Sequence, residues 1–235
     1  MGLDIAVGLL ATLKRDDPEF YDIHCNVLAG LNKVLAKAGQ NSHIEPDDLA
    51  PEHCFEAQMW GYSGLHHVRR LAAHLALHNE VPDPIAYNEA ADDPDLQQYY
   101  DIAGRYLDSK PGGIFGRFKS RPVPPRFMHL IVHSDCEGFY LPRATQVICD
   151  DDNHESIGGF VGSSIVLSEE VDVLCAALSI PADLDPEDER VWENAESPLG
   201  SGPLWQLHGI ETFVLTRLRK ACQLSKQSGS AIVFI

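Results

Sequence analysis

The sequence predicts an α+β fold, with a single mixed β-sheet packed by about six helices. Apolar segments with strand character lie near both ends and in the middle of the chain, and apolar residues at helical spacing fill much of the rest. The apolar fraction of 44% is ordinary for a protein with a full core. The expected strands are residues 3–13, 127–132, 138–141 and 231–235. At 235 residues we expect a single domain, 1–235.

The N-terminal part is expected to begin with a strand and continue with helices. The apolar segment 3–13 opens with alternation, which predicts the first strand. Asp, Pro and Glu at 17–19 predict a helix start, because they supply a cap, a preset φ and a charge that suits the helix dipole. An apolar stripe continues to Gly39, which predicts the end of that helix. Ser63 and Asp93 are expected to cap two further helices.

A basic segment, 109–126, follows these helices. It contains five Lys or Arg residues and no acid, together with several Gly and Pro residues. We interpret it as a mobile loop within one domain, because neither side of it has enough strands for its own sheet. It could clamp an anionic ligand, although a solvated connector is the more common role of such a segment.

The C-terminal part is expected to alternate between strands, loops and helices. In order, we expect strands at 127–132 and 138–141, a Gly-rich loop at 157–164, a helix capped by Ser168, a short helix at 185–192 and a long helix at 209–228. Gly229 predicts the end of the long helix. The apolar run 231–235 predicts the last strand, in a sheet covered on both faces.

The charge balance limits the classes of partner. The chain has 35 acidic and 18 basic residues, which gives a net charge of −17. Because such a surface repels phosphates, we expect no binding to nucleic acid, and the charge favours a basic protein as partner. The simpler alternative is that the charge only keeps the protein soluble. The sequence leaves the oligomeric state open.

The sequence also predicts a cytoplasmic protein without membrane contact. No apolar run approaches the ~20 residues of a membrane helix, and the first residues lack the basic start of a signal peptide. The six cysteines include no CxxC pair, and three of them fall on apolar helix faces. That pattern is typical of reduced cysteines in a cytosolic protein.

Polar residues gather after the apolar run 127–132, which makes this strand end a candidate chemical site. On a strand, His133 and Asp135 would share a face, with Cα atoms ~6.5 Å apart. They could bind one divalent metal ion, or Asp135 could orient His133 as a general base. Glu137 follows at the edge of the same site. In the structural alternative, Asp135 bonds backbone amides in a turn and His133 packs in the core.

The start of the second helix is another polar focus. Tyr62, Ser63 and His66 crowd an N-terminus whose dipole could hold an anion. Strand ends and helix N-termini tend to meet at the rim of a sheet, so we expect His66 to line one pocket with His133 and Asp135. His66 is therefore a third candidate catalytic residue, and Tyr62 and Ser63 are candidate ligand-binding residues.

Two further groups are weaker candidates. Ser163 and Ser164 end the Gly-rich loop and are candidate ligand-binding residues, although the loop lacks the lysine of a P-loop. His74 and His78 lie four residues apart on a helix and could bind a metal ion. A solvated helix face is the more common reason for that spacing. The divalent metal is the one candidate cofactor.

Several short segments follow one another in a distinctive order. They are Met-Gly-Leu at 1–3, Trp-Gly-Tyr-Ser-Gly-Leu-His at 60–66, Ile-Gly-Gly at 157–159, Leu-Ser-Glu-Glu-Val at 167–171 and Gly-Ser-Ala-Ile-Val-Phe at 229–234. This order resembles the YfbM-like family of small bacterial proteins of unknown function. The resemblance implies a bacterial-type cytoplasmic α+β domain, and it transfers no catalytic residue to this chain.

Two functions from different classes fit these observations. The first is an acidic intracellular binding protein that covers a basic partner, as an immunity-like inhibitor covers a toxin. The second is a small-ligand or metal-assisted hydrolase with its site around His133 and Asp135. The acidic excess favours the first function and the polar cluster favours the second, so the sequence leaves open whether the protein is an enzyme.

Overall fold

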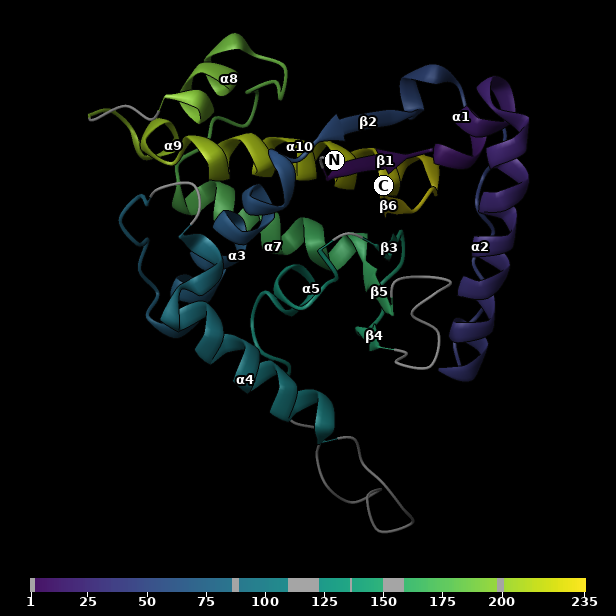
Figure 1. Cartoon of the computed structure of the whole chain (residues 1–235), viewed down its shortest axis with the longest axis horizontal. Helices are drawn as coiled ribbons and strands as arrows, with labels where there is room; N and C mark the ends of the chain where they lie inside the picture. Colours follow the sequence, from purple (N-terminus) through teal and green to yellow (C-terminus); the bar gives the residue numbers. More distant parts are fainter. Residues whose placement is uncertain (1–2, 86–88, 110–122, 136, 150–158, 198–200) are drawn as a thin grey trace.

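The computed structural model describes residues 3–85, 89–109, 123–135, 137–149, 159–197 and 201–235, and it confirms the α+β class (Figure 1). Within these residues one mixed sheet has the strand order β2-β1-β6-β3-β5-β4. The strands are β1 (Asp4–Val7), β2 (Phe55–Gln58), β3 (Phe139–Leu141), β4 (Ile148–Cys149), β5 (Phe160–Ser163) and β6 (Ile232–Phe234). Strand β6 lies at the centre, antiparallel to both β1 and β3. Strands β3 and β5 form the parallel pair of the sheet.

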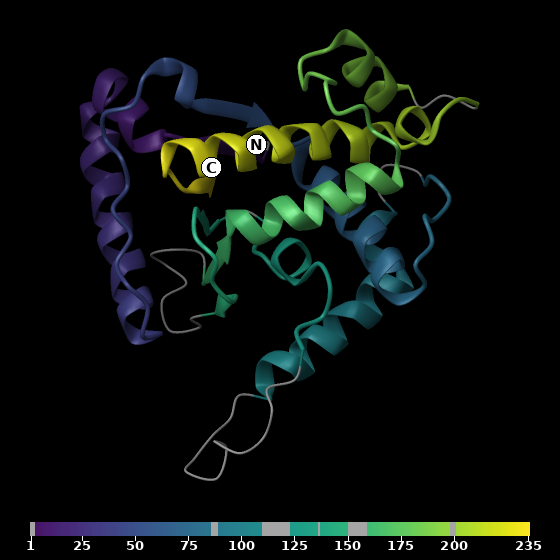
Figure 2. The same ribbon diagram turned by 180° about the vertical axis from the view of Figure 1, so that it is seen from behind.

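Helices pack on both faces of this sheet. Over the described residues there are nine α-helices: α1 (Leu9–Asp16), α2 (Pro18–Lys37), α3 (Gly61–Leu77), α4 (Pro94–Asp108), α5 (Met128–Ile131), α7 (Ser164–Ala177), α8 (Glu189–Glu196), α9 (Leu204–Leu207) and α10 (Gly209–Ser228). Two 3-10 turns, η1 (Pro51–His53) and η2 (Ala90–Asp92), complete the helical elements. Figure 2 shows α10 and α7 side by side through the middle of the molecule, with α2 on the far side of the sheet.

The two cores follow from the alternation of side chains along the central strands. Ile232 and Phe234 join the large core built with α3, α7 and α10. Val233 points to the opposite face, where it joins Leu31 and Leu35 of α2 in a smaller core. Because successive strand residues face opposite sides, three consecutive apolar residues serve both cores. Coverage of both sheet faces, which the apolar strands predict, is confirmed.

Several helix boundaries are where the sequence places them. Asp17 caps α2 by accepting from the backbone N–H of Phe20, and Asp93 caps α4 by accepting from the N–H groups of Asp95 and Leu96. Helix α10 spans Gly209–Ser228 and ends at Gly229, whose φ of 76° is the left-handed conformation that glycine favours. Short-range caps therefore predict these helices well.

The predicted strand 127–132 is wrong, because this run forms helix α5. Phe127 starts it with a left-handed φ of 62°, and the carboxylate of Glu170 accepts from the N–H groups of His129 and Leu130. A six-residue apolar run does not distinguish a strand from a short helix. Here a distant carboxylate satisfies the N–H groups that begin the helix, and this contact selects the helix.

Four other boundaries differ from the sequence expectation. Helix α3 begins at Gly61, with Trp60 rather than Ser63 in the cap position. The segment 3–13 is a strand only as far as Val7, because left-handed Gly8 turns the chain into α1. The Gly-rich segment 157–164 contains β5, and Ser163 rather than Ser168 caps the next helix. The short helix α8 begins at Glu189, with Asp188 as its cap. Strands β2 and β4 lack a clear sequence pattern and were not expected.

Parts of two expectations lie outside the described residues. These are the core of the basic segment, 110–122, and most of the turn and Gly-rich segment, 150–158. Among the described residues, no helix combines the length and the apolar composition needed to cross a bilayer.

Gly209 provides a direct test of the packing that fixes α8 on α10. A Cβ atom at this position would lie 1.9 Å from the carbonyl oxygen of Asn194, in the backbone of α8. We predict that Gly209→Ala lowers the free energy of unfolding by ~2–3 kcal/mol, because the two backbones must separate.

Gly104→Ala is the matched control, since a Cβ atom at that position in α4 would have no atom within 4 Å. It should be neutral or stabilise by ~0.5–1 kcal/mol, because alanine is the better helix former. Urea unfolding of both variants measures the difference. Equal stabilities would contradict the close contact between α8 and α10.

Candidate functional site

His133 is a core residue in this structure. Only 3% of it is exposed, and its ring stacks on Tyr140 with the ring centroids 4.0 Å apart. The rings of Phe160 and Phe234 pack edge-on against it, at 4.8 and 4.9 Å. Burial lowers the pKa of His133 to about 3, so the imidazole is neutral at physiological pH. The residue follows a helix rather than a strand, which removes the shared strand face expected for it and Asp135.

Asp135 lies next to His66, the third candidate catalytic residue. Its Oδ2 atom is 3.6 Å from Nε2 of His66, and its Oδ1 atom accepts a hydrogen bond from Nη1 of Arg69. Burial lowers the pKa of His66, although the charge of Asp135 opposes this shift. The structure therefore brings His66 and Asp135 together, while the ring of His133 lies among aromatic side chains.

Arg69, for which the sequence gives little functional signal, holds residues 130–135 in place. Its guanidinium is buried and donates to the carbonyl oxygens of Leu130, at 3.2 Å, and of Ser134, at 3.3 Å. It also donates to the carbonyl oxygen of His133. One side chain of α3 thus donates hydrogen bonds to the backbone carbonyl groups at the end of α5 and in the turn after it. The sequence signal is weak, because the pair of arginines at 69–70 resembles a solvated patch of the helix.

The candidate ligand-binding residues have varied surroundings. Tyr62 and Glu137 are exposed, and the hydroxyl of Ser63 donates to the carbonyl oxygen of Trp60 at 3.3 Å. Ser163 is fully buried and caps α7, and its hydroxyl donates to the carbonyl oxygen of Arg143 at 2.7 Å. The hydroxyl of Ser164, also buried, lies 2.8 Å from that of Ser225. The two buried hydroxyls are thus engaged within the fold.

His74 belongs to an ion-pair network between α3 and α4. Its Nε2 atom is 3.1 Å from Oδ2 of Asp93, and its Nδ1 atom is 3.4 Å from Oδ2 of Asp95. One ligand atom from each of the three lies within 4.8 Å of the others, a spacing that a metal ion would accept. However, Nε of Arg70 is 2.7 Å from Oδ2 of Asp93 and already supplies a positive charge. Arg70 therefore supplies the positive charge of this network, and the network attaches α4 to α3.

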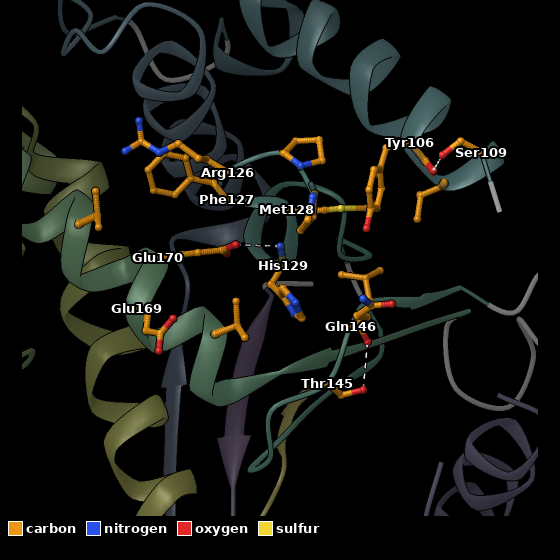
Figure 3. Close-up of a pocket in the computed structure, with 16 residues that line it drawn as sticks. Tyr106, Ser109, Arg126, Phe127, Met128, His129, Thr145, Gln146, Glu169 and Glu170 are labelled. Carbon is orange, nitrogen blue, oxygen red and sulfur yellow. Dashed lines mark hydrogen bonds between the residues drawn. The ribbon is translucent and has the colours of Figure 1, made fainter. Parts of the chain in front are cut away.

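A large cavity lies between α4, α5 and α7 (Figure 3). Its volume is about 630 Å³, within the ~300–1,000 Å³ range of ligand pockets. Most of the residues that line it are apolar, including Tyr106, Phe127 and Met128. Neither His133 nor His66 lines it, so this cavity is distinct from the pocket that the sequence predicts.

Among the described lining residues, the buried polar side chains are those of Glu170 and His129. Each oxygen of Glu170 accepts one backbone N–H, from His129 at 3.1 Å and from Leu130 at 2.8 Å. Burial raises the pKa of Glu170 to about 7 and lowers the pKa of His129 to about 4. Nδ1 of His129 accepts from the N–H of Ser163 at 3.0 Å, which places the proton of the neutral ring on Nε2.

A second feature is the acidic segment, which we define as residues 183–196. It contains seven acids and one base. Glu189, Glu193 and Glu196 are exposed and lie at helical spacings of four and three, so they share one face of α8. The opposite face of α8 is buried through Val191, Asn194 and Ala195. In Figures 1 and 2, α8 lies on the outside of the molecule beyond α10.

Basic side chains hold the acidic segment from inside. Arg217 of α10 is buried, with its guanidinium carbon 3.4 Å from the ring centroid of Phe213 and its Nη2 atom 3.1 Å from Oε1 of Glu187. Arg219 donates to the carbonyl oxygens of Pro181, at 3.0 Å, and Leu184, at 3.3 Å. The base within the segment, Arg190, is paired with its neighbour Asp188. The outer face of α8 is therefore negative.

The comparison with protein families decides the family. A model described as "Putative DNA-mimic protein" matches residues 1–234. The chain belongs to this DNA-mimic family. Comparisons with curated proteins and with solved structures gave no match. The resemblance to the YfbM-like family stays a prediction.

The family corrects the expected class of partner. From the charge, the sequence predicts a basic protein as partner and no binding to nucleic acid. A DNA mimic binds proteins whose ordinary ligand is DNA, so nucleic acid defines the partner class after all. A surface that is negative enough to repel DNA can also resemble DNA to a protein that binds DNA. The coarser prediction, an acidic binding protein, agrees with the family.

Glu170 leads to a prediction about stability and pH. Its pKa is raised from 4.5 in the unfolded chain to about 7, so the native state keeps a proton that the unfolded state releases. Stability should therefore fall as pH rises from about 4.5 to about 7, by about 3 kcal/mol for this group. Glu170→Gln cannot ionise and should gain that amount relative to the unchanged protein over the same interval.

Urea unfolding at a series of pH values measures this gain. Glu169→Gln is the matched control, because Glu169 is exposed on the same helix, and its curve should stay parallel to that of the unchanged protein. Parallel curves for Glu170→Gln as well would show that the carboxyl group of Glu170 ionises normally.

Proposed function

We propose that the protein binds a DNA-binding protein through the acidic segment, whose carboxylates stand in for DNA phosphates. The observation that supports this most is the outer face of α8, where Glu189, Glu193 and Glu196 are exposed while the nearby arginines are engaged within the segment or below it. Membership of the DNA-mimic family supports the partner class.

The spacing of these carboxylates is compatible with phosphate mimicry. With a rise of ~1.5 Å per residue, the eight residues from Glu189 to Glu196 span ~10 Å of helix axis, and three of them are glutamates on the exposed face. That is one charge per ~5 Å, against one per ~3.4 Å along a single DNA strand. A basic groove that follows one strand would therefore meet a charge density lower than that of DNA but of the same order.

The attachment of the acidic segment favours binding without rearrangement. Trp192 packs edge-on against Phe213, with ring centroids 4.8 Å apart, and Arg217 pairs with Glu187. Because α8 is already fixed on α10, little conformational entropy is lost when a partner binds. Carboxylates on a fixed helix also reproduce the regular charge spacing of a duplex better than a flexible acidic tail would.

Inhibition would follow from the same contact. A partner whose DNA-binding groove is occupied by α8 cannot hold a duplex at the same time. A basic toxin that acts on DNA would be inhibited in this way, which is the narrower, immunity-like form of the proposal.

Competition with DNA is the direct test. A panel of purified DNA-binding proteins of different folds is each loaded with a fluorescent duplex, and the protein is titrated while anisotropy is followed. We expect it to displace the duplex from at least one of them, with weaker displacement as salt is raised. Formation of a ternary complex with the duplex, or displacement from no member of the panel, would contradict the proposal.

Charge neutralisation tests the location of the surface. The triple variant Glu189→Gln, Glu193→Gln, Glu196→Gln should weaken binding by ~1–3 kcal/mol and flatten its dependence on salt, because exposed charge pairs contribute ~0.2–1 kcal/mol each. The control variant Glu52→Gln, Glu56→Gln, Asp101→Asn removes three exposed acids elsewhere. Equal weakening by both sets would place the binding energy in the net charge rather than in α8.

A further inference from the structure

The cavity between α4, α5 and α7 contains a buried acid that has no partner cation among the described residues. Glu170 is only 9% exposed, and the hydrogen bonds of its carboxylate come from the backbone N–H groups of His129 and Leu130. A carboxylate can accept about four hydrogen bonds. Counting donors in the described part of the chain, two positions on its oxygens therefore remain for a donor from the cavity.

The other charged groups around the cavity do not neutralise this acid. Glu169 is a second acid of the lining, and His129 is neutral because burial lowers its pKa to about 4. Arg126 is the one cationic side chain among the described lining residues. It is exposed, its guanidinium carbon lies 5.0 Å from the ring centroid of Phe127, and it donates to the carbonyl oxygen of Leu75 at 3.4 Å. Above the raised pKa of Glu170, about 7, the cavity wall is therefore negative where it is most buried.

The rest of the wall suits an apolar body. Figure 3 shows Glu170 reaching from α7 toward the backbone nitrogen of His129, with Phe127 and Met128 close by and Tyr106 on the far side. Aromatic faces attract cations, and the thioether of methionine adapts to irregular apolar groups. A buried acid inside an apolar and aromatic wall is the complement of an amine carried on an apolar skeleton.

We propose that this cavity binds a small organic cation, a primary amine on an aromatic or aliphatic body. The ammonium group donates hydrogen bonds to the free positions of the Glu170 carboxylate, and the body packs against Phe127 and Met128. This site is separate from the acidic segment on α8, so it is independent of the proposed binding to a DNA-binding protein.

Binding of three matched probes tests the charge preference. Tryptamine, tryptophol and indoleacetate share one aromatic body and carry an amine, a hydroxyl and a carboxylate. Calorimetric titration at about pH 8 leaves the amine charged and Glu170 ionised. We expect tryptamine to bind at least ~10-fold more tightly than tryptophol, because a charge-assisted hydrogen bond is stronger than a neutral one, and indoleacetate to bind least. Indoleacetate binding as tightly as tryptamine, or no binding by any probe, would overturn the proposal.

Two variants locate the site. Glu170→Gln should reduce the affinity for tryptamine to that for tryptophol and leave tryptophol unchanged, whereas Glu169→Gln should change both by less than ~3-fold, since an exposed charge contributes little. Val173→Trp, at a half-exposed lining position of α7, should fill the cavity and abolish binding of both probes without unfolding the chain. Tryptamine binding that survives in both Glu170→Gln and Val173→Trp would overturn the assignment to this cavity.

Discussion

The burial of helix α10 is the constraint on which the rest of the structure depends. Fourteen of its 20 residues are buried, so the chain must surround it, and α3, α7, α8 and strands β1, β2 and β6 do so. Its buried acid, Glu211, has Oε1 3.5 Å from Nδ1 of His67 and 3.3 Å from Nδ1 of His208. Burial alone would raise the pKa of Glu211, but the two imidazoles outweigh it and lower that pKa to about 2. The contact between Glu211 and His67 thus joins α10 to α3 inside the core.

This packing buries some of the charged side chains and exposes others. Arg69 and Arg217, each 1% exposed, use their guanidinium groups to hold turns and helix ends from inside. The outer face of α8 is acidic. The two arginines thus serve the interior of the fold, while the net charge of the whole chain is −17. In this member of the DNA-mimic family, the packing around α10 that buries Arg217 also places the acidic face of α8 on the outside.

What could be predicted from the sequence depends on how far apart the deciding residues lie. Asp93 and Gly229 act within one helical turn, so the helices that they delimit are predictable. Helix α5 is not, because Glu170, about 40 residues away, satisfies its first N–H groups. The same separation hides the cavity, since Glu170 resembles a solvated acid near a helix start. His66 does lie beside Asp135, but a buried arginine of α3 arranges this rather than a strand end.

The position of β6 affects how the chain can be synthesised and fold. This strand joins the antiparallel β1–β2 pair to the parallel β3–β5 pair, and the backbone of Asp4 exchanges two hydrogen bonds with that of Ile235, at 3.1 and 3.0 Å. Until residues 232–234 have left the ribosome, the nascent polypeptide holds two separate sheet fragments with open apolar edges. Completion of the sheet therefore depends on pairing residues near position 5 with residues near position 234, and such long-range pairing is slow and leaves strand edges exposed until it forms.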